Sequence, residues 1–338
     1  MAELSGWPVS LQAVADDWPG QAWQQVFAAS WPSYRAWYSR DGQQARPSLE
    51  LCRQALDRHM PELVPVWRRL VELTGGDPLA ARMLSLLDPP AYLTGCSQAV
   101  WRGGPPVLAR NYDYAPALLE RVVCGTRWNG RRVVGMSDCL WGLLDGMNDR
   151  GLAVSLAFGG RRVLGQGFGI PLVVRYLLEV CGTVDQACRV LTRLPVHMAY
   201  SLTMVDAGAA LVTAYLGPDR PPRFERRPVA TNHQEQVEWP EQAFATRSVE
   251  REAALVGLLA DPGVDESAFL AAFMRPPLYS DAFALGFGTL YTAVYRPADL
   301  SLEYRWPGSV WRHSVDGFVD GSHQVLLQEP PASGDRDR

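Results

Sequence analysis

Residues 1–90 show apolar positions at the three- and four-residue spacing of amphipathic helices. The spacing is clearest in segments 20–29, 47–60 and 61–73, which read GQAWQQVFAA, PSLELCRQALDRHM and PELVPVWRRLVEL. Proline and Gly-Gly steps separate these segments, and Asp88-Pro89-Pro90 ends the region. The pattern therefore predicts a helical N-terminal segment over residues 1–95.

From Ala91 onward, alternating strand-like runs replace the helical spacing. Residues 91–102 and 106–114 flank a turn at 103–106, and 138–158 reads as a second hairpin that turns at 145–151. Helices are predicted over 171–181, 183–194, 244–260 and 265–275, and further hairpins over 200–216 and 289–306. Thr183 with Gln186 fits a capping box at a helix start. This order favours an α+β core over residues 96–328, built from antiparallel sheets with outer helices and followed by a disordered tail over 329–338.

Composition excludes several classes of protein. The chain has 32 Lys+Arg and 36 Asp+Glu, a net charge of -4, and none of the cations is lysine. Pyridoxal-phosphate enzymes, lysine aldolases and phosphate-loop enzymes all need a lysine and are therefore excluded. The nearly balanced charge predicts no nucleic-acid partner and no membrane partner. Because no secretory signal and no apolar run of about 20 residues is found, we expect a cytoplasmic protein.

Cysteine and histidine spacing predicts neither a metal site nor a cofactor. The six cysteines include no CxxC pair, and no two of the five histidines lie four residues apart. Reduced thiols are therefore expected.

Cys96 lies among polar residues at the start of the first predicted hairpin. If the turn is Gly103 to Pro106, Cys96 pairs with Asp113, and Arg110 lies a few ångströms along the neighbouring strand. A neighbouring cation lowers the pKa of a thiol and favours the nucleophilic thiolate. The alternative is that Cys96 is a small buried apolar residue, which is the interpretation given to the other five cysteines.

Four motifs in this order resemble the family of acyl-CoA:6-aminopenicillanic acid acyltransferases, to which the choloylglycine hydrolases are more distantly related. They are Thr94-Gly95-Cys96-Ser97, Ala109-Arg110-Asn111-Tyr112-Asp113, the segment 146–152 (GMNDRGL) and Thr231-Asn232-His233. The resemblance covers about residues 91–315 and implies an N-terminal nucleophile (Ntn) hydrolase with an αββα four-layer sandwich. It also implies self-cleavage between Gly95 and Cys96, after which 1–95 is expected to stay packed on 96–338.

The resemblance also implies roles for individual side chains. Cleavage would free the α-amine of Cys96, whose reference pKa of about 7.7–8.0 suits a general base for its own thiol. Asn232 and the backbone near Asn148 would bind the oxyanion, and Asp113 would hold the amine. Arg110 would steady the thiolate or orient Asp113. Arg251 is expected in the site, with Arg247 as the alternative, and Tyr112 in the substrate pocket.

These residues predict an amidohydrolase or acyltransferase that acts on linear amides through an acyl-enzyme on Cys96. The substrate would be a small N-acyl amide, with acyl-CoA as a second substrate in the acyltransferase case. One alternative is an uncut thiol hydrolase in which His233 is the base. Another is an inactive member that binds a ligand. The oligomeric state is not predicted.

Overall fold

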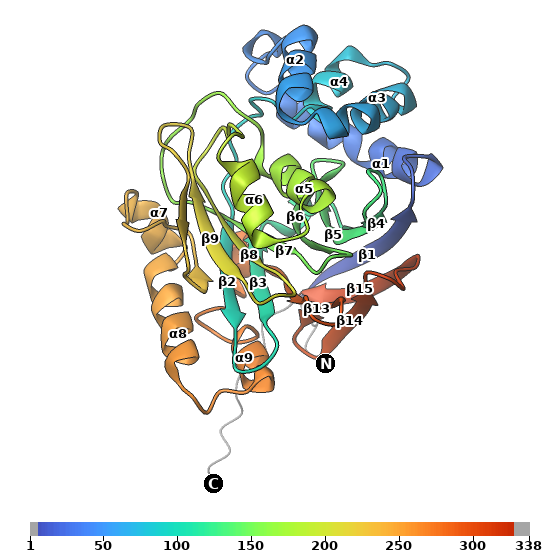
Figure 1. Ribbon diagram of the computed structural model, residues 1–338. Helices are drawn as coiled ribbons and strands as arrows, with labels where there is room; N and C mark the ends of the chain where they lie inside the picture. The colour runs from blue at the N-terminus through green and yellow to red at the C-terminus, as the bar shows by residue number, and fades with distance from the viewer. Residues whose placement is uncertain (1–5, 328–338) are drawn as a thin grey trace.

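The computed structural model describes residues 6–327, which form two stacked β-sheets with helices outside them (Figure 1). The order in the nine-stranded sheet is β10 (Arg223–Glu225), β9 (Leu211–Leu216), β8 (Tyr200–Val205), β7 (Ala153–Phe158), β6 (Gly142–Asn148), β5 (Val133–Asp138), β4 (Val122–Thr126), β1 (Trp7–Asp16) and β15 (Gly321–Leu327). The order in the six-stranded sheet is β11 (Val229–Ala230), β2 (Gly95–Trp101), β3 (Val107–Tyr114), β12 (Gly288–Arg296), β13 (Ser301–Trp306) and β14 (Ser309–Ser314).

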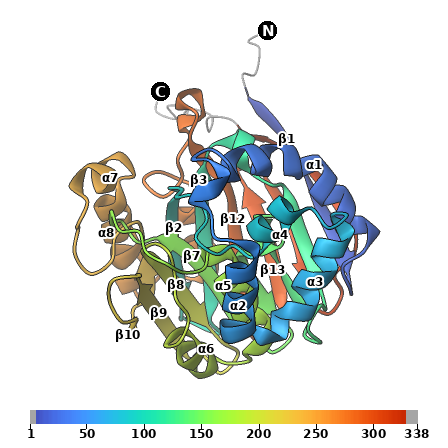
Figure 2. The same cartoon turned by 90° about the horizontal axis from the view of Figure 1, so that it is seen from above.

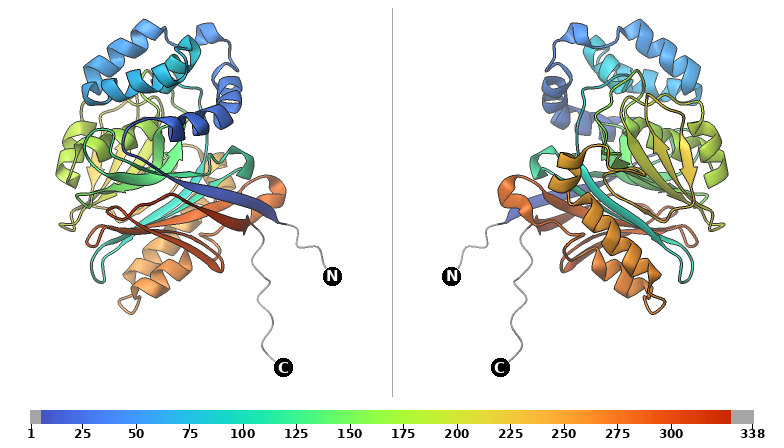
Figure 3. Two further views of the ribbon diagram at one scale, coloured as in Figure 1. Left: turned by 90° about the vertical axis from the view of Figure 1, so that its right-hand side faces the viewer. Right: turned by 90° about the vertical axis from the view of Figure 1, so that its left-hand side faces the viewer.

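The two sheets pack directly on each other, with β2 against β7 and β6 against β12. On the outer face of the nine-stranded sheet lie α5 (Ile170–Val180) and α6 (Val184–Leu191). On the outer face of the six-stranded sheet, α8 (Ser248–Ala260) packs on β2 and β11. Beside α8 lie α7 (Pro240–Ala245) and α9 (Glu266–Ala272). The layers are seen edge-on in Figure 3. The predicted α+β class with an αββα sandwich is confirmed.

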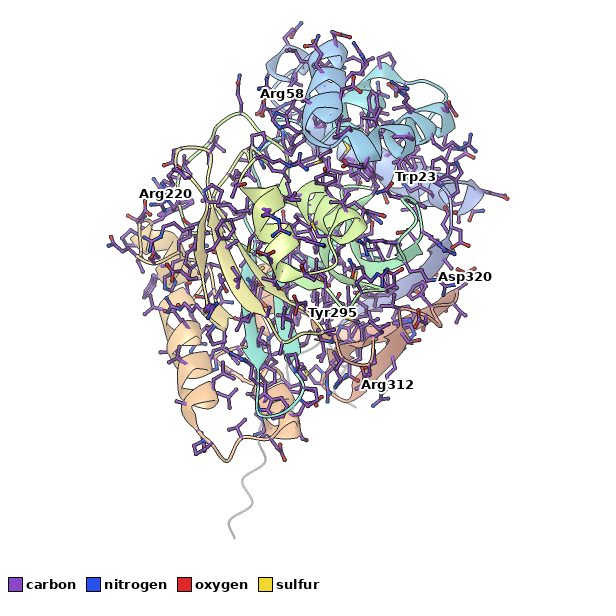
Figure 4. The ribbon with its side chains drawn as sticks, in the orientation of Figure 1. Trp23, Arg58, Arg220, Tyr295, Arg312 and Asp320 are labelled. Carbon is purple, nitrogen blue, oxygen red and sulfur yellow. The ribbon has the colours of Figure 1, made fainter. Side chains whose placement is uncertain are left out.

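Four N-terminal helices form a group at the top of the molecule in Figure 1, and this group faces the viewer in Figure 2. They are α1 (Gln21–Tyr38), α2 (Leu49–His59), α3 (Val64–Leu73) and α4 (Pro78–Leu84). The indole of Trp23, labelled in Figure 4, donates a hydrogen bond of 2.8 Å to the Leu140 carbonyl. The indole of Trp141 donates one of the same length to the Leu84 carbonyl. One indole donates from the helices to the core and the other from the core to the helices, so buried hydrogen bonds join the two parts in both directions.

The N-terminal segment also contains a strand, so the prediction of helices alone over residues 1–90 was wrong. In β1 the side chains of Val9, Leu11 and Ala13 are buried, whereas Ser10 and Gln12 between them are exposed. This period of two is that of a half-buried strand. β1 pairs antiparallel with β15 and parallel with β4, inside the larger sheet. Residues that precede Cys96 therefore form part of the sheet itself.

Several predicted boundaries differ from the structure. Strands β4, β5, β10, β14 and β15 were missed, and the predicted helix over 244–260 is two helices, α7 and α8. The turn between β6 and β7 follows Asn148 instead of beginning at Asp145. The Thr183 hydroxyl accepts the Gln186 N–H at 3.3 Å, so this predicted cap is confirmed. The predicted disordered tail, 329–338, lies outside the described residues. Within residues 6–327, no helix combines the length and the apolar character needed to cross a membrane.

Leu11 tests the contribution of β1 to stability, because its side chain is fully buried. Leu11→Ala should lower the free energy of unfolding by about 2–5 kcal/mol, through lost burial and the cavity that remains. The exposed neighbour Gln12 provides the control. Gln12→Ala should change the free energy of unfolding by less than about 0.5 kcal/mol. Chemical denaturation of both variants measures the difference. Equal effects at the two positions would contradict the placement of β1 in the core.

Candidate active site

The hairpin of β2 and β3 carries most of the predicted site. Its loop is one residue longer than the sequence suggested, because Trp101 pairs with Val107. Cys96 therefore lies opposite Tyr112, and Gly95 opposite Asp113, so the predicted pairing of Cys96 with Asp113 was wrong by one residue. Because side chains alternate along a strand, this register places Cys96 and Asp113 on opposite faces of the hairpin.

On the face that points into the sandwich, Cys96 meets a buried cation. Nη2 of Arg110 lies 3.2 Å from Cys96 Sγ, and both side chains are fully buried. Nη1 of the same guanidinium donates to Asp145 Oδ2 on β6 at 2.6 Å. The Tyr291 and Tyr295 hydroxyls of β12 also donate to Asp145. Figure 4 labels Tyr295 among these interior side chains. The Arg110 charge is thus compensated by a carboxylate from the opposite sheet.

The protonation of Cys96 differs from the expectation. Burial raises the pKa of the Cys96 thiol, and the neighbouring Arg110 charge opposes this effect only in part. Arg110 acts in the predicted direction, but desolvation of the thiolate is the larger effect. In the uncut chain Cys96 is therefore held as a thiol.

On the other face of the hairpin, Arg251 joins three site residues. Its Nη1 donates to Ser97 Oγ at 2.8 Å and to Asp113 Oδ2 at 2.9 Å, and its Nη2 donates to Asn232 Oδ1 at 2.6 Å. Burial raises the pKa of the Asp113 carboxyl, although Arg251 counteracts part of this rise. The alternative arginine, Arg247, is exposed and pairs with Glu250. Of the two candidates, only Arg251 contacts the other site residues.

Asn232 holds the chain on both sides of Gly95. Its Oδ1 accepts the Cys96 backbone N–H at 2.8 Å, and its Nδ2 lies 3.3 Å from the Thr94 carbonyl. A side chain on Gly95 has no room, because a Cβ there would lie 2.8 Å from Phe287 Cζ and 3.0 Å from Asp113 Cβ. The Gly95–Cys96 peptide bond is thus enclosed by the side chains of Asn232, Asp113 and Phe287.

Two further candidates lie apart from these contacts. The Asn148 amide donates to the Leu178 and Cys181 carbonyls, and its Oδ1 accepts the Arg150 and Leu152 N–H groups. Its own backbone N–H bonds to the Leu152 carbonyl. Asn148 therefore fixes the turn after β6, and its oxyanion role stays a prediction.

His233, the alternative base, is also committed elsewhere. Its Nδ1 lies 2.7 Å from Ser248 Oγ, and its Nε2 lies 3.2 Å from Glu252 Oε2. None of the hydrogen bonds found in the described part of the chain joins His233 to Cys96.

Tyr112 lies on the Cys96 face of the hairpin, and the Arg110 guanidinium carbon is 4.7 Å from the centre of its ring. The ring also lines a cavity of about 410 Å³ between α1 and the loops after β3 and β5. This cavity agrees with the expectation that Tyr112 borders a substrate pocket. Within residues 6–327, no group of three or more His, Cys, Asp or Glu is arranged to hold a metal ion.

The sequence did not assign a role to five side chains that complete these contacts: Ser97, Asp145, Thr289, Tyr291 and Tyr295. Asp145 was assigned to a turn, although a charge inside the apolar run GLLDGMN could have signalled a buried ion pair. Thr289 donates to Asp113 Oδ1 at 2.7 Å. Thr289 and Tyr291 come from the far end of the sequence, and only the sheet order brings them to the hairpin.

Comparison with known proteins agrees with the resemblance. The family model "Acyl-coenzyme A:6-aminopenicillanic acid acyl-transferase" matches residues 101–311, more than half of the chain. The chain belongs to this family. The acyl-transferase match begins just after Cys96 and includes Arg110, Asp113, Asn232 and Arg251. No curated protein sequence matches the chain.

Solved structures similar to this acyl-transferase family member include three hydrolases. An N-acylethanolamine-hydrolyzing acid amidase ortholog of Caenorhabditis elegans has 14% identity and a TM-score of 0.46, covering 68% of this chain and 99% of its own. Penicillin V acylase of Agrobacterium tumefaciens has 15% identity and a TM-score of 0.46, covering 65% and 86%. A mutant conjugated bile acid hydrolase of Clostridium perfringens has 11% identity and a TM-score of 0.41, covering 69% and 98%.

Asp145→Asn tests the compensation of the Arg110 charge. Without the carboxylate, the uncompensated guanidinium should stabilise the thiolate and lower the pKa of Cys96. The variant should also lose about 3–5 kcal/mol of stability, because one partner of a buried ion pair is removed. Thiolate absorbance against pH, with a Cys96→Ala baseline in each background, measures the pKa.

Asp149→Asn is the control for this experiment, because Asp149 lies in the turn after β6 and is only half-buried. It should leave the thiol pKa unchanged. A Cys96 pKa that does not fall in Asp145→Asn would show that Asp145 does not offset Arg110.

Proposed function

We propose that this protein is a cysteine Ntn amidohydrolase that cuts its own chain between Gly95 and Cys96 and then acts on linear amides. The observation that carries the proposal is the Asn232 side chain, which bonds to the Cys96 N–H and reaches the Thr94 carbonyl. Two further observations support the proposal. The buried Cys96 thiol adjoins the buried Arg110 guanidinium, and Gly95 leaves room around the peptide bond because it has no side chain. Together these contacts hold a nucleophile beside the peptide bond that it would attack.

Self-cleavage would begin with addition of Cys96 Sγ to the Gly95 carbonyl carbon. The thiol proton passes to the departing nitrogen as the Gly95–Cys96 C–N bond breaks, which leaves a thioester and a free α-amine. Water then hydrolyses the thioester to the Gly95 carboxylate and the Cys96 thiol. Because Sγ is uncharged in the uncut chain, this first step starts from a thiol.

Turnover would use the α-amine that cleavage releases. This nitrogen is already held by Asn232 Oδ1 at 2.8 Å, so cutting converts a bonded amide into a positioned base. The amine takes the Cys96 proton as Sγ attacks the substrate carbonyl, and it returns the proton to the leaving amine. An acyl-enzyme thioester remains until water hydrolyses it.

Asn232 Nδ2 is the candidate donor to the oxyanion. In the uncut chain it lies 3.3 Å from both the Thr94 and the Phe158 carbonyls. Displacement of Thr94 after cleavage would leave this amide free to bind a developing negative charge. The second predicted donor, a backbone N–H near Asn148, has no contact with Cys96 among the hydrogen bonds of the described residues, so Asn232 is the better supported of the two.

Hydrolysis is favoured over acyl transfer, because water needs no acceptor site of its own. The substrate would then be a small N-acyl amide, and acyl-CoA would take part only if an amine replaced water as the acceptor. The Cys96–His233 mechanism is less well supported, because both His233 nitrogens have other partners. The Arg110–Cys96 contact on one face of the hairpin, and the contacts of Arg251 with Asp113 and Asn232 on the other, also favour an enzyme over an inactive binding protein.

The two products of cleavage would remain one molecule. Residues 1–95 include β1, which lies between β4 and β15 within the larger sheet. Release of this segment would expose two strand edges and the apolar face of the N-terminal helices, so association after cleavage is strongly favoured.

Amine labelling tests the self-cleavage. Because the chain has no lysine, its only primary amines are α-amines, and cleavage adds one more. A cut molecule should take two labels and yield a fragment that begins Cys-Ser-Gln-Ala. Cys96→Ala should give a single uncut chain with one label, whereas Cys188→Ala, at a half-buried helical cysteine, should be cut normally. Wild-type protein that stays intact after prolonged incubation would refute self-cleavage.

Asn232→Ala tests the oxyanion role. The variant should slow amide hydrolysis by about 10²–10³-fold in kcat, as expected for loss of one oxyanion donor. Asn129→Ala, in the turn after β4, serves as the control and should keep wild-type kcat. Because Asn232 also holds the Cys96 N–H, the rate is compared on cut protein, confirmed by mass. A tenfold effect or less would exclude the proposed role.

A further inference from the structure

The cavity bordered by Tyr112 combines aromatic and acidic side chains in its walls. Its volume is about 410 Å³, which suits a small organic molecule. Five aromatic side chains line it, from α1, the segment before β2, and β3: Tyr34, Trp37, Tyr92, Tyr112 and Tyr114. Trp37 lies edge-on to both Tyr34 and Tyr92, with ring centres 6.2 and 6.1 Å apart. A cavity surrounded by aromatic faces is suited to an organic cation, because each ring presents a negative face.

Two carboxylates lie in the same wall. Glu120 Oε2 lies 2.8 Å from the Tyr34 hydroxyl, and Asp138 Oδ1 lies 3.2 Å from the same oxygen. A single hydroxyl proton cannot be donated fully to both. Glu120 also accepts hydrogen bonds from the Ser137 hydroxyl and the Leu140 N–H, and Asp138 accepts one from the Cys139 thiol. None of the salt bridges within residues 6–327 includes either carboxylate, although Arg121 also borders the cavity. The pair therefore has hydrogen-bond donors but, in the described part of the chain, no cation partner.

Two polar groups in the cavity wall, the Tyr92 hydroxyl and the Asp138 carboxyl, are available to a ligand. The Tyr92 hydroxyl oxygen is buried, and it has no hydrogen-bond partner among the described residues. Burial, together with the charge of Glu120, raises the pKa of Asp138 to about 7. A donor bound in the cavity would give the Tyr92 hydroxyl a partner, and a cation there would favour the ionised form of Asp138.

The cavity also leads to the nucleophile along one strand. Arg110, Tyr112 and Tyr114 alternate on the same face of β3, and Arg110 contacts Cys96 Sγ. Side chains two residues apart on a strand are about 7 Å apart. Tyr112 thus borders the Cys96 environment on one side and the cavity on the other.

We propose that this aromatic cavity binds an organic ammonium group, so that the preferred substrates are amides that carry a cation on the part bound beside Tyr112. The inference rests on the proposed function for its catalytic consequence, but the binding site itself does not depend on turnover. Trp37 and the Tyr rings contact the cation, and Asp138 and Glu120 supply the opposite charge.

Binding is tested on the uncut Cys96→Ala protein by calorimetry at about pH 8, where Asp138 is mostly ionised. The probes are 2-phenylethylammonium and its neutral analogue 2-phenylethanol. The ammonium probe should bind at least about tenfold more tightly. Asp138→Asn, added to this background, should remove most of that difference, and Trp37→Leu should weaken the ammonium probe more than the alcohol. Asp149→Asn and Trp18→Leu, at sites outside the cavity, should change neither affinity.

Turnover separates this inference from the proposed function. The wild-type enzyme is given 6-aminohexanoyl and heptanoyl p-nitroanilides, which differ by a terminal ammonium or methyl group. The inference predicts a higher kcat/KM for the ammonium compound, lost in Asp138→Asn. Selective binding without turnover of either anilide would contradict the amidase and keep the cation site. Equal affinities for the two probes, or an equal loss of both in Asp138→Asn, would overturn the cation site whatever the turnover.

Discussion

The buried ion pair between Arg110 and Asp145 is the interaction on which the site depends. Arg110 belongs to the six-stranded sheet and Asp145 to the nine-stranded sheet, and their atoms approach to 2.6 Å in the interior. A buried charge without a partner would be very costly, so this contact fixes the two sheets relative to each other at the level of Cys96. Cys96 lies on the same guanidinium, and its position is therefore set by the packing of the whole sandwich.

A second buried arginine, Arg251, joins another pair of layers on the other face of the hairpin. Arg251 joins Ser97, Asp113 and Asn232, and so connects α8 to the strands on both sides of the nucleophile. Arg110 faces the thiol, whereas Arg251 faces the groups that surround the backbone nitrogen. In the proposed mechanism, this division would separate control of the sulfur from control of the amine, because nucleophile and base would belong to the same residue.

Much of this arrangement could be predicted from the sequence, and the remainder depends on packing between segments that are far apart in the chain. Cys96, Arg110, Asp113, Asn232 and Arg251 were identified because short motifs occur in a recognisable order, and the structure brings these five together. The choice of Arg251 over Arg247 needed the structure, because one helical turn decides which of them points at Asp113.

The errors have equally specific causes. The hairpin register slipped by one residue, because loop length cannot be read from a Gly-Gly-Pro-Pro turn alone. For Asn148 the structure adds a second role, because its side chain makes four backbone contacts that fix the turn after β6. β1 was missed among helical segments, although its alternating pattern is present. Asp145 and Thr289 come from strands whose neighbours are set by sheet order, which no local pattern encodes.

The contacts around Gly95 position the proposed base, the Cys96 nitrogen, before cleavage would make it a free amine. In the uncut chain the Cys96 nitrogen is an amide with no basicity, and burial keeps the sulfur protonated. Asn232 nevertheless holds that nitrogen where a free amine would be needed. In the proposed self-cleavage, the same bond would orient the peptide for attack and, after cutting, orient its product as the base. The described contacts of Cys96 Sγ are with the Thr94 hydroxyl and the Arg110 guanidinium, and neither is a base at neutral pH. The proposed mechanism therefore makes cleavage the step that supplies the base, so that action on other amides would follow cleavage and not precede it.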